Sequence, residues 1–195
     1  MNFTREEYFK QYSEFYDQGG IAASGSPEFN RSQAYYDLPK RGGFEDGMSL
    51  LDYGCGCGAM CGGLEVEDYY GVDIVPKAIE LAKQHFPNKK FDVLEVGKLK
   101  CEPKDFCIAL SVFTHCLPQD TDDCLRDIAT HTTKGALIDI LEGKPEKSDL
   151  HVRYWNKEEF IKKLKEFGFE YTGEFSNTSQ YDYVHTYLIL KKYEI

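Results

Sequence analysis

The sequence predicts an α/β fold with one seven-stranded, mostly parallel β-sheet, helices on both faces and an antiparallel hairpin at one edge. Two observations predict this class. Over residues 48–195, short apolar runs alternate with helix-like segments, and the runs are apolar on both faces, as expected for strands buried inside a parallel sheet. The last two runs have no helix between them, which indicates the edge hairpin.

Residues 1–47 differ from this pattern and predict an N-terminal helical cap or lid. A first helix is expected over residues 4–16, because the threonine at its start is followed three residues later by a glutamate, as in a capping box. A second helix is expected over residues 26–38, where a serine and then a proline begin the segment. We therefore divide the chain into a cap, residues 1–47, and a main domain, residues 48–195.

The main domain is expected to alternate regularly between strands and helices. Strands are expected at residues 48–54, 68–74, 89–96, 105–112, 134–141, 169–176 and 181–192. Helices are expected directly after the first strand, at residues 76–85, at residues 120–130 and from Asn156 to Phe167. The last helix carries its own start signal, because Asn156 can cap it and Glu159 stands at its third position.

The composition excludes several classes of protein. The 195 residues include 23 lysines and arginines against 33 aspartates and glutamates, which gives a formal net charge of −10 at pH 7. This balance argues against nucleic acid as a partner, because phosphate backbones are bound by clustered basic residues. The chain lacks an apolar run of ~18 residues and the apolar core of a signal peptide. We therefore expect a cytoplasmic protein with no membrane partner and with its seven cysteines reduced; the oligomeric state stays open.

The most informative stretch is a glycine loop after the first strand. Gly54, Gly56 and Gly58 stand at alternate positions, where they let the backbone turn sharply and approach a ligand closely. Asp73 follows 19 residues after Gly54, at the end of the second strand, close to the ~20 residues expected for an acid that binds ribose hydroxyls. Together, these features predict a nucleoside site at the carboxyl ends of the strands.

At these positions the sequence resembles the class I S-adenosylmethionine-dependent methyltransferases. The runs that carry the resemblance are LLDYGCGCG, GVDIVPKAIELAKQHF, FDVLEV, DFCIALSVFTH and KEEFIKKLKEFGFE. The resemblance covers about residues 48–192 and implies a Rossmann-like sheet, S-adenosylmethionine as the cofactor and methyl transfer as the activity. Gly62 and Gly63 depart from the family pattern and predict that the helix after the loop is short or broken.

The resemblance also implies a role for each matching residue. The methionine part of the cofactor would be held by Asp52, Gly54, Cys55, Gly56 and Gly58. The ribose and adenine would be bound by Asp73, Ile74, Glu95 and Val96, with Glu95 at a position where the family often has aspartate. The floor under the sulfonium would be formed by Ser111 and Val112.

Two alternatives stay open beside this hypothesis. Gly54, Gly56 and Ala59 also fit the looser glycine pattern of NAD-binding oxidoreductases. The residues after Ala59 look like the completion of one sheet rather than a substrate domain with a hydride-transfer site. The other alternative is a domain that binds S-adenosylmethionine without catalysing a reaction.

The candidate base for methyl transfer is His115. Methyl transfer requires that nucleophile and methyl carbon are held in line, and an oxygen or nitrogen acceptor must also lose a proton. His115 stands four residues beyond Ser111, where the acceptor should enter; the alternative role is a helix-start residue bonded to the backbone. The chain is too short for an appended recognition domain, so we expect a small-molecule acceptor with its O or N atom methylated.

Further acceptor contacts are expected from two segments. Tyr16, Arg31 and Tyr36 belong to the cap, which could fold over the site. Arg153 and Tyr154 precede the last helix, in a loop that borders the acceptor in the resembling family. Packing of the tyrosines and a surface position for the loop are the alternatives.

No metal site is predicted. Cys55, Cys57 and Cys61 are close enough in sequence to suggest one. Two of the three lie inside the glycine loop, where the cofactor would bind, and a fourth ligand is not evident nearby.

Overall fold

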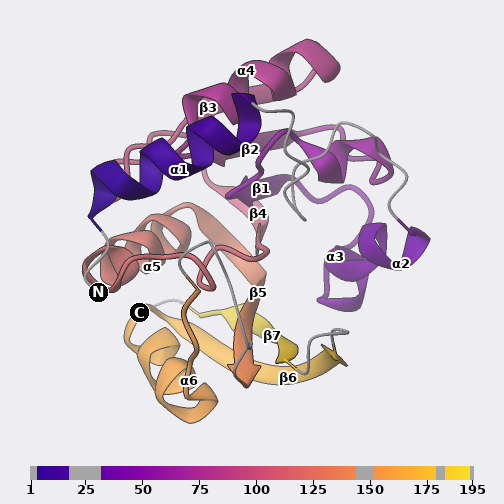
Figure 1. The fold of residues 1–195 in the computed structure, drawn as a ribbon. Helices are drawn as coiled ribbons and strands as arrows, with labels where there is room; N and C mark the ends of the chain where they lie inside the picture. Colours follow the sequence, from indigo (N-terminus) through magenta and orange to yellow (C-terminus); the bar gives the residue numbers. More distant parts are fainter. Residues whose placement is uncertain (1–3, 18–31, 144–151, 179–182, 194–195) are drawn as a thin grey trace.

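A computed structural model describes residues 4–17, 32–143, 152–178 and 183–193 of the chain (Figure 1). Its seven strands form one sheet in the order β3-β2-β1-β4-β5-β7-β6. The strands are β1 (Leu50–Tyr53), β2 (Tyr69–Asp73), β3 (Lys90–Val93), β4 (Lys104–Ala109), β5 (Thr132–Gly143), β6 (Phe169–Thr178) and β7 (Tyr183–Lys192). Strands β1 to β5 pair in parallel, whereas β7 runs antiparallel to both β5 and β6. The predicted mostly parallel sheet with an antiparallel edge hairpin is confirmed.

Six α-helices and two short 3-10 helices are described around the sheet. They are α1 (Arg5–Asp17), α2 (Gln33–Tyr36), α3 (Leu38–Arg41), η1 (Ala59–Gly62), α4 (Pro76–His85), η2 (Pro118–Asp120), α5 (Thr121–Thr130) and α6 (Lys157–Glu166). The α6 cap forms as predicted, because the Asn156 side chain accepts a hydrogen bond from the Glu159 backbone N–H at 3.0 Å. The helix after the glycine loop is a single 3-10 turn, as the Gly62-Gly63 pair predicts.

Several predicted boundaries are wrong, and two of these differences have a clear cause in the chain. The second helix of the cap was expected to run unbroken to residue 38, but its described part is divided at Asp37 into α2 and α3, where Pro39 cannot donate to the α2 hydrogen-bond ladder. The first part of that prediction, residues 26–31, lies outside the described residues. Strand β3 ends at Val93 rather than residue 96, because the chain turns at Gly97, which has a φ of +78°.

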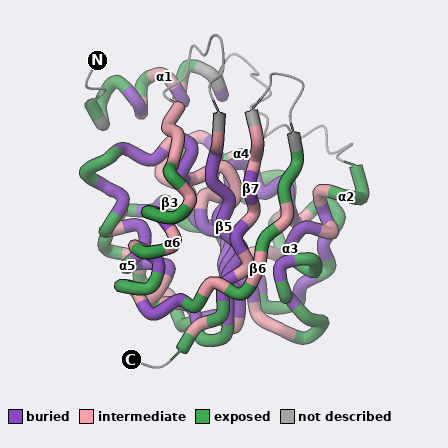
Figure 2. The backbone as a smooth tube through the Cα atoms, turned by 90° about the horizontal axis from the view of Figure 1, so that it is seen from below, coloured by how far each residue is buried: buried purple, intermediate pink, exposed green. Residues whose placement is uncertain are grey.

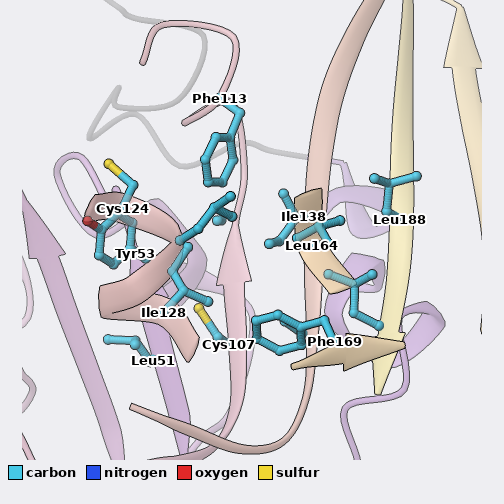
Figure 3. Packing of buried hydrophobic residues seen from close by; sticks show 14 of the residues in the cluster. Leu51, Tyr53, Cys107, Phe113, Cys124, Ile128, Ile138, Leu164, Phe169 and Leu188 are labelled. Carbon is cyan, nitrogen blue, oxygen red and sulfur yellow. The ribbon is translucent and has the colours of Figure 1, made fainter. Parts of the chain in front are cut away.

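The core consists of two apolar layers, one on each face of the sheet. Figure 2 shows that much of β5 and β7, between the two layers, is buried or half-buried. Helices α5 and α6 cover one face with side chains such as Leu125, Ile128 and Leu164, which pack on the sheet residues Leu51 and Ile138 (Figure 3). The other face is covered by α2, α3, η1 and α4. Both layers bury strand residues completely, which explains why the strands of this sheet are apolar on both faces.

Helix α1 belongs to neither layer. It lies beside α4 near the carboxyl edge of the parallel strands (Figure 1), with Tyr8, Tyr12 and Tyr16 packed against Val75 and Ala78. These three tyrosines are spaced four residues apart and therefore share one face of the helix. The proposed division into a cap and a main domain at residue 47 stays a prediction.

Candidate functional site

A cavity of about 760 Å³ lies at the carboxyl edge of the parallel strands. This volume is within the ~300–1,000 Å³ of small-molecule sites, and its position is where open α/β sheets bind ligands. Its wall is formed by the ends of β1 to β4, the loop after β4, the start of α5 and one face of α1. The lining residues include Tyr8, Tyr12, Tyr16, Tyr53, Gly54, Asp73, Ile74, Val93, Glu95, Val96, Leu110, Ser111, Val112, His115, Cys116, Asp120 and Cys124.

At two positions of the loop, the neighbouring side chains leave room only for glycine. A Cβ at Gly54, whose φ is +84°, would lie 2.4 Å from Val112 Cγ2. A Cβ at Gly58, whose φ is +81°, would lie 3.0 Å from the Phe91 ring. Any larger residue would strain the backbone and displace these neighbours, so the loop keeps its close approach to the cavity only with glycine.

Asp73 joins the glycine loop to the end of β2. Its Oδ2 accepts a hydrogen bond from the Gly56 N–H at 2.9 Å, and its Oδ1 accepts one from the Val75 N–H at 2.9 Å. Burial raises the pKa of this carboxyl, and the two backbone donors oppose the shift. Each carboxylate oxygen keeps a further lone pair, so Asp73, which lines the cavity, can also accept hydrogen bonds from ligand hydroxyls.

Asp52 is buried behind the cavity wall. Its Oδ2 accepts a hydrogen bond from the Tyr69 hydroxyl at 2.6 Å. Burial raises the pKa of Asp52 to about 7, the Tyr69 hydrogen bond opposes this shift, and the nearby charge of Asp73 adds to it. Asp52 does not line the cavity. Of the other loop residues expected to hold the cofactor, Gly54 lines it, whereas Cys55, Gly56 and Gly58 do not.

The residues expected to surround adenine come together on one side of the cavity. Ile74 follows Asp73, and Glu95 and Val96 follow β3, so all three lie at neighbouring strand ends. Glu95 forms an ion pair with Lys98 and has an exposed side chain. This side of the cavity therefore combines apolar surface with one carboxylate at its rim.

The floor of the cavity is held by a buried carboxylate that the sequence did not single out. Ser111 has a left-handed φ of +59°, and its N–H donates a hydrogen bond to Asp139 Oδ1. The Asp139 Oδ2 lies 2.7 Å from His185 Nδ1, and Asp139 itself is 1% exposed. The aspartate in the otherwise apolar run of β5 was the signal that could have revealed this group. His185 in β7 is the partner of that carboxylate.

His115 lies in the cavity wall, in the turn after β4. Its backbone N–H donates to the Val112 carbonyl at 3.0 Å, which closes the turn. Its ring meets the Tyr12 ring edge to face, with 5.8 Å between the ring centroids. The loop after β4 and helix α1 therefore meet at this residue.

The tyrosines of α1 form a further part of the cavity wall. Burial raises the pKa of Tyr8, Tyr12 and Tyr16, and the negative charge of Asp73 acts on all three in the same direction. Tyr16 was a predicted contact, whereas Tyr8 was not considered. The four-residue spacing of the three tyrosines could have indicated one common face, although it does not say what that face covers.

Three of the other predicted acceptor contacts lie outside the cavity. Arg153 donates from Nη1 to the Thr121 hydroxyl at 2.7 Å and stacks on Trp155 with its guanidinium carbon 3.6 Å from the ring centroid. Tyr154 and Tyr36 do not line the cavity, and Tyr36 packs in the core layer beside η1. Arg31 lies outside the described residues.

A parallel α/β sheet with a glycine loop after its first strand and a carboxylate at the end of its second defines an enzyme class that binds a nucleoside cofactor. Comparison with known protein families identifies the class more closely, because the family described as a methyltransferase domain matches residues 44–191 of the chain. The chain belongs to this methyltransferase family and is an S-adenosylmethionine-dependent enzyme. The NAD-binding alternative is thereby excluded. Comparison of the sequence with curated proteins gave no match.

Solved structures of the same fold have little sequence in common with the chain. Magnesium protoporphyrin IX methyltransferase from Synechocystis PCC 6803, with bound SAH, has a TM-score of 0.70 at 14% identity, covering 97% of this chain and 98% of its own. A TehB-like SAM-dependent methyltransferase from Corynebacterium glutamicum has a TM-score of 0.62 at 20% identity, with 96% and 97% covered. The [4+2]-cyclase SpnF has a TM-score of 0.74 at 14% identity, with 97% and 96% covered.

The cavity fits S-adenosylmethionine in size and chemistry. The bare backbone of Gly54 leaves room that a Cβ would fill, Asp73 offers acceptors for hydroxyls, and Ile74 and Val96 offer apolar surface for a flat base. Among the described residues, no group of three or more His, Cys, Asp or Glu side chains is arranged to hold a metal ion. In the same part of the chain, none of the helices combines the length and the apolar character needed to cross a membrane.

Proposed function

We propose that the enzyme transfers a methyl group to an oxygen or nitrogen atom of a small molecule. The observation that carries this proposal is the wall that α1 adds to the cavity. Tyr8, Tyr12 and Tyr16 line the space of about 760 Å³ together with the strand ends and His115, whose ring contacts the Tyr12 ring. A space of this size suits a nucleoside cofactor with a compact acceptor, whereas a polymer would need an open groove.

The charges around the cavity favour a neutral or cationic acceptor. Asp73, Glu95 and Asp120 line it, while none of the described lining residues is a lysine or an arginine. An anionic acceptor would meet repulsion from these carboxylates and from the net charge of −10, which also disfavours nucleic acid. A neutral alcohol, a phenol or an amine meets no such cost.

In this proposal the residues bind the cofactor as the family resemblance implies. Asp73 accepts hydrogen bonds from the ribose hydroxyls, Ile74, Glu95 and Val96 surround adenine, and the glycine loop holds the methionine part. When bound, S-adenosylmethionine supplies an electrophilic methyl group. Ser111 and Val112 form the floor beneath the reacting centre, and Asp52 supports the loop from behind.

His115 is the proposed base. Its position in the cavity wall supports this role, because a base has to reach the proton of the acceptor. Tyr16 contacts the acceptor from α1 in the same proposal. Arg153 and Tyr154 would act from the adjoining loop, and Tyr36 and Arg31 from the segment after α1. Arg153, Tyr154 and Tyr36 do not line the described cavity, and Arg31 lies outside the described residues.

The cofactor assignment is tested with Asp73→Asn and S-adenosylhomocysteine in isothermal titration. The amide is nearly isosteric and keeps one acceptor oxygen, but it loses the charge that strengthens hydrogen bonds to hydroxyls, so we expect affinity to fall about 10–100-fold. Asp92→Asn, one strand further along, is the control and should bind like the wild type. Equal affinity for wild type and Asp73→Asn would refute the ribose assignment.

The acceptor is tested by a transfer assay with isotopically labelled S-adenosylmethionine over panels of alcohols, phenols, amines and carboxylates. We expect transfer to members of the neutral or amine panels. With the acceptor found, His115→Ala should lower kcat about 100-fold or more while S-adenosylhomocysteine affinity changes little. Binding without transfer to any panel would favour the silent binding module, and unchanged kcat in His115→Ala would remove His115 as the base.

A further inference from the structure

Two cysteines stand side by side in the wall of the cavity. The Sγ atoms of Cys116 and Cys124 are 3.8 Å apart, and both residues line the cavity although each is less than a tenth exposed. Cys116 lies in the loop after β4, next to His115, and Cys124 lies in α5, where Figure 3 shows it beside the Tyr53 ring. The pair therefore links two elements that both contribute to the site.

The surroundings distinguish Cys116 from the other thiols of the protein. Its Sγ is 3.9 Å from the Thr121 hydroxyl, which itself accepts a hydrogen bond from Arg153 Nη1 at 2.7 Å. The hydrogen bond with Cys124 lowers the pKa of Cys116, and Thr121 and Arg153 act in the same direction, while burial and the charge of Asp120 oppose them. By contrast, burial raises the pKa of Cys55, Cys57, Cys61, Cys101 and Cys107.

We propose that Cys116 and Cys124 form a reactive dithiol site that hydroperoxides and thiophilic electrophiles reach through the cofactor cavity. The inference combines two sulfurs in contact, a hydroxyl near one of them and a cavity that both residues line. A single thiol in this position could only be capped. Two thiols in contact can close on each other or bind one soft electrophile together.

The reaction with a hydroperoxide balances in two steps. The Cys116 thiolate attacks one peroxide oxygen, the O–O bond breaks, and Cys116 becomes a sulfenic acid while the other oxygen leaves as water or an alcohol after taking a proton. The Cys124 sulfur then attacks the sulfenic sulfur and displaces its oxygen as water, so that the S–S bond forms. Two thiols lose two electrons in total, and the peroxide gains them.

The new bond would alter the site as well as the two cysteines. The sulfurs have to approach from 3.8 Å to about 2.05 Å, which draws the loop that carries His115 toward α5. Since both residues line the cavity, we expect the cross-linked protein to bind S-adenosylhomocysteine at least threefold more weakly. Bound S-adenosylhomocysteine should in turn protect the thiols, because it fills the path by which reagents reach them.

The test is peptide mapping of the full chain after treatment with a small excess of hydrogen peroxide. We expect a Cys116–Cys124 cross-link that dithiothreitol reverses, and its rate of formation should fall at least fivefold when S-adenosylhomocysteine saturates the protein. Phenylarsine oxide, which binds paired thiols, should give one adduct per chain. Cys101→Ser, which removes a partly exposed thiol outside the cavity, is the control and should leave both results unchanged.

Separate serine variants identify the two roles. Cys124→Ser should leave Cys116 as a sulfenic acid that dimedone captures, whereas Cys116→Ser should leave Cys124 unreactive. Should either variant fold poorly, the wild-type peptide map decides the question alone. The proposal is overturned if Cys61 or Cys101 is oxidised before the pair, if the two thiols oxidise without cross-linking, or if bound S-adenosylhomocysteine gives no protection. Failure to bind S-adenosylhomocysteine would instead count against the proposed function, and the cross-link would still be measurable.

Discussion

The two carboxylates nearest the glycine loop have different environments although their residues are close in space. Asp73 accepts two backbone N–H donors at the cavity, while Asp52 has a tyrosine hydroxyl as its hydrogen-bond partner and is buried. A single neutral donor compensates a buried charge poorly, which is why burial dominates the raised pKa of Asp52. The sequence motif places both acids in the site but cannot distinguish the one that lines the cavity from the one behind it.

The raised pKa of Asp52 predicts that the free energy of unfolding depends on pH, and that Asp52→Asn removes this dependence. The pKa of Asp52 is raised from 3.8 to about 7, so the folded protein binds a proton that the unfolded chain releases between these values. The contribution is fully present below about pH 4 and is lost as the pH rises to about 7, on the order of 4 kcal/mol at most. Asp52→Asn keeps an acceptor for Tyr69, so it should match the wild type near pH 4, gain a small advantage by pH 5 and exceed its stability most at pH 8.

Urea unfolding of both proteins at pH 5 and pH 8 measures the effect as a difference between variants. Asp92→Asn is the matched control, because Asp92 also accepts a tyrosine hydroxyl, from Tyr70 at 2.9 Å, but has a side chain that is 61% exposed. It should change stability equally at both pH values. A wild-type advantage over Asp52→Asn at pH 8 would contradict the assignment of a costly buried charge.

At the scale of elements, α1 depends on few contacts. Its start is closed by a capping box, in which Thr4 N–H donates to Glu7 Oε2 at 2.8 Å and Glu7 N–H donates to Thr4 Oγ1 at 3.2 Å. Its packing comes from one stripe of tyrosines against α4. Helix α6, by contrast, inserts Phe160 and Leu164 into the main core layer.

We therefore expect the same type of cap to matter locally in α1 and globally in α6. Thr4→Ala should accelerate amide exchange in α1 about 2–30-fold, the equivalent of about 0.5–2 kcal/mol, with no change in the Tm. Asn156→Ala removes the corresponding cap of α6 and should lower the Tm of the whole protein by several degrees. Exchange and melting measured on both variants check this. A lowered Tm in Thr4→Ala would mean that α1 unfolds with the sheet.

The contrast between these helices also shows what the sequence can predict. Local patterns were sufficient to predict the sheet strands, the α6 cap and the glycine loop, because residues close in sequence determine both turn geometry and burial on both faces of a strand. The strip of α1 that faces the cavity was not predictable in this way. Tyr8, Tyr12 and Tyr16 identify a helix face, but the surface that they cover depends on the distant residues Val75 and Ala78. The contact between Asp139 and Ser111 is equally long-range.

At the scale of the molecule, one sheet separates two core layers, and each central strand contributes alternate side chains to both layers. Leu50 and Leu51 are adjacent in β1 and are both fully buried, yet they belong to opposite layers. Loss of one layer would expose the apolar face of strands that the other layer still needs. This geometry favours a single cooperative unfolding transition rather than separate melting of the two sides.

The chain's one tryptophan allows this cooperativity to be measured. Trp155 packs on Phe160 with 4.5 Å between ring centroids and donates from its indole N–H to the Phe113 carbonyl at 2.8 Å, so its fluorescence reports on the layer of α5 and α6. Far-UV circular dichroism reports on the whole molecule. We expect the two urea transitions to coincide, and S-adenosylhomocysteine at 100 times its Kd should stabilise both by about 2.7 kcal/mol, because it binds the folded state.

A fluorescence transition that precedes the circular dichroism transition would show that the α5–α6 layer detaches while the opposite layer stays folded. His115, Cys116 and Cys124 belong to elements of the α5–α6 layer, so the ligand would then stabilise the fluorescence transition more than the circular dichroism transition. Unfolding of α1 alone would not give this difference.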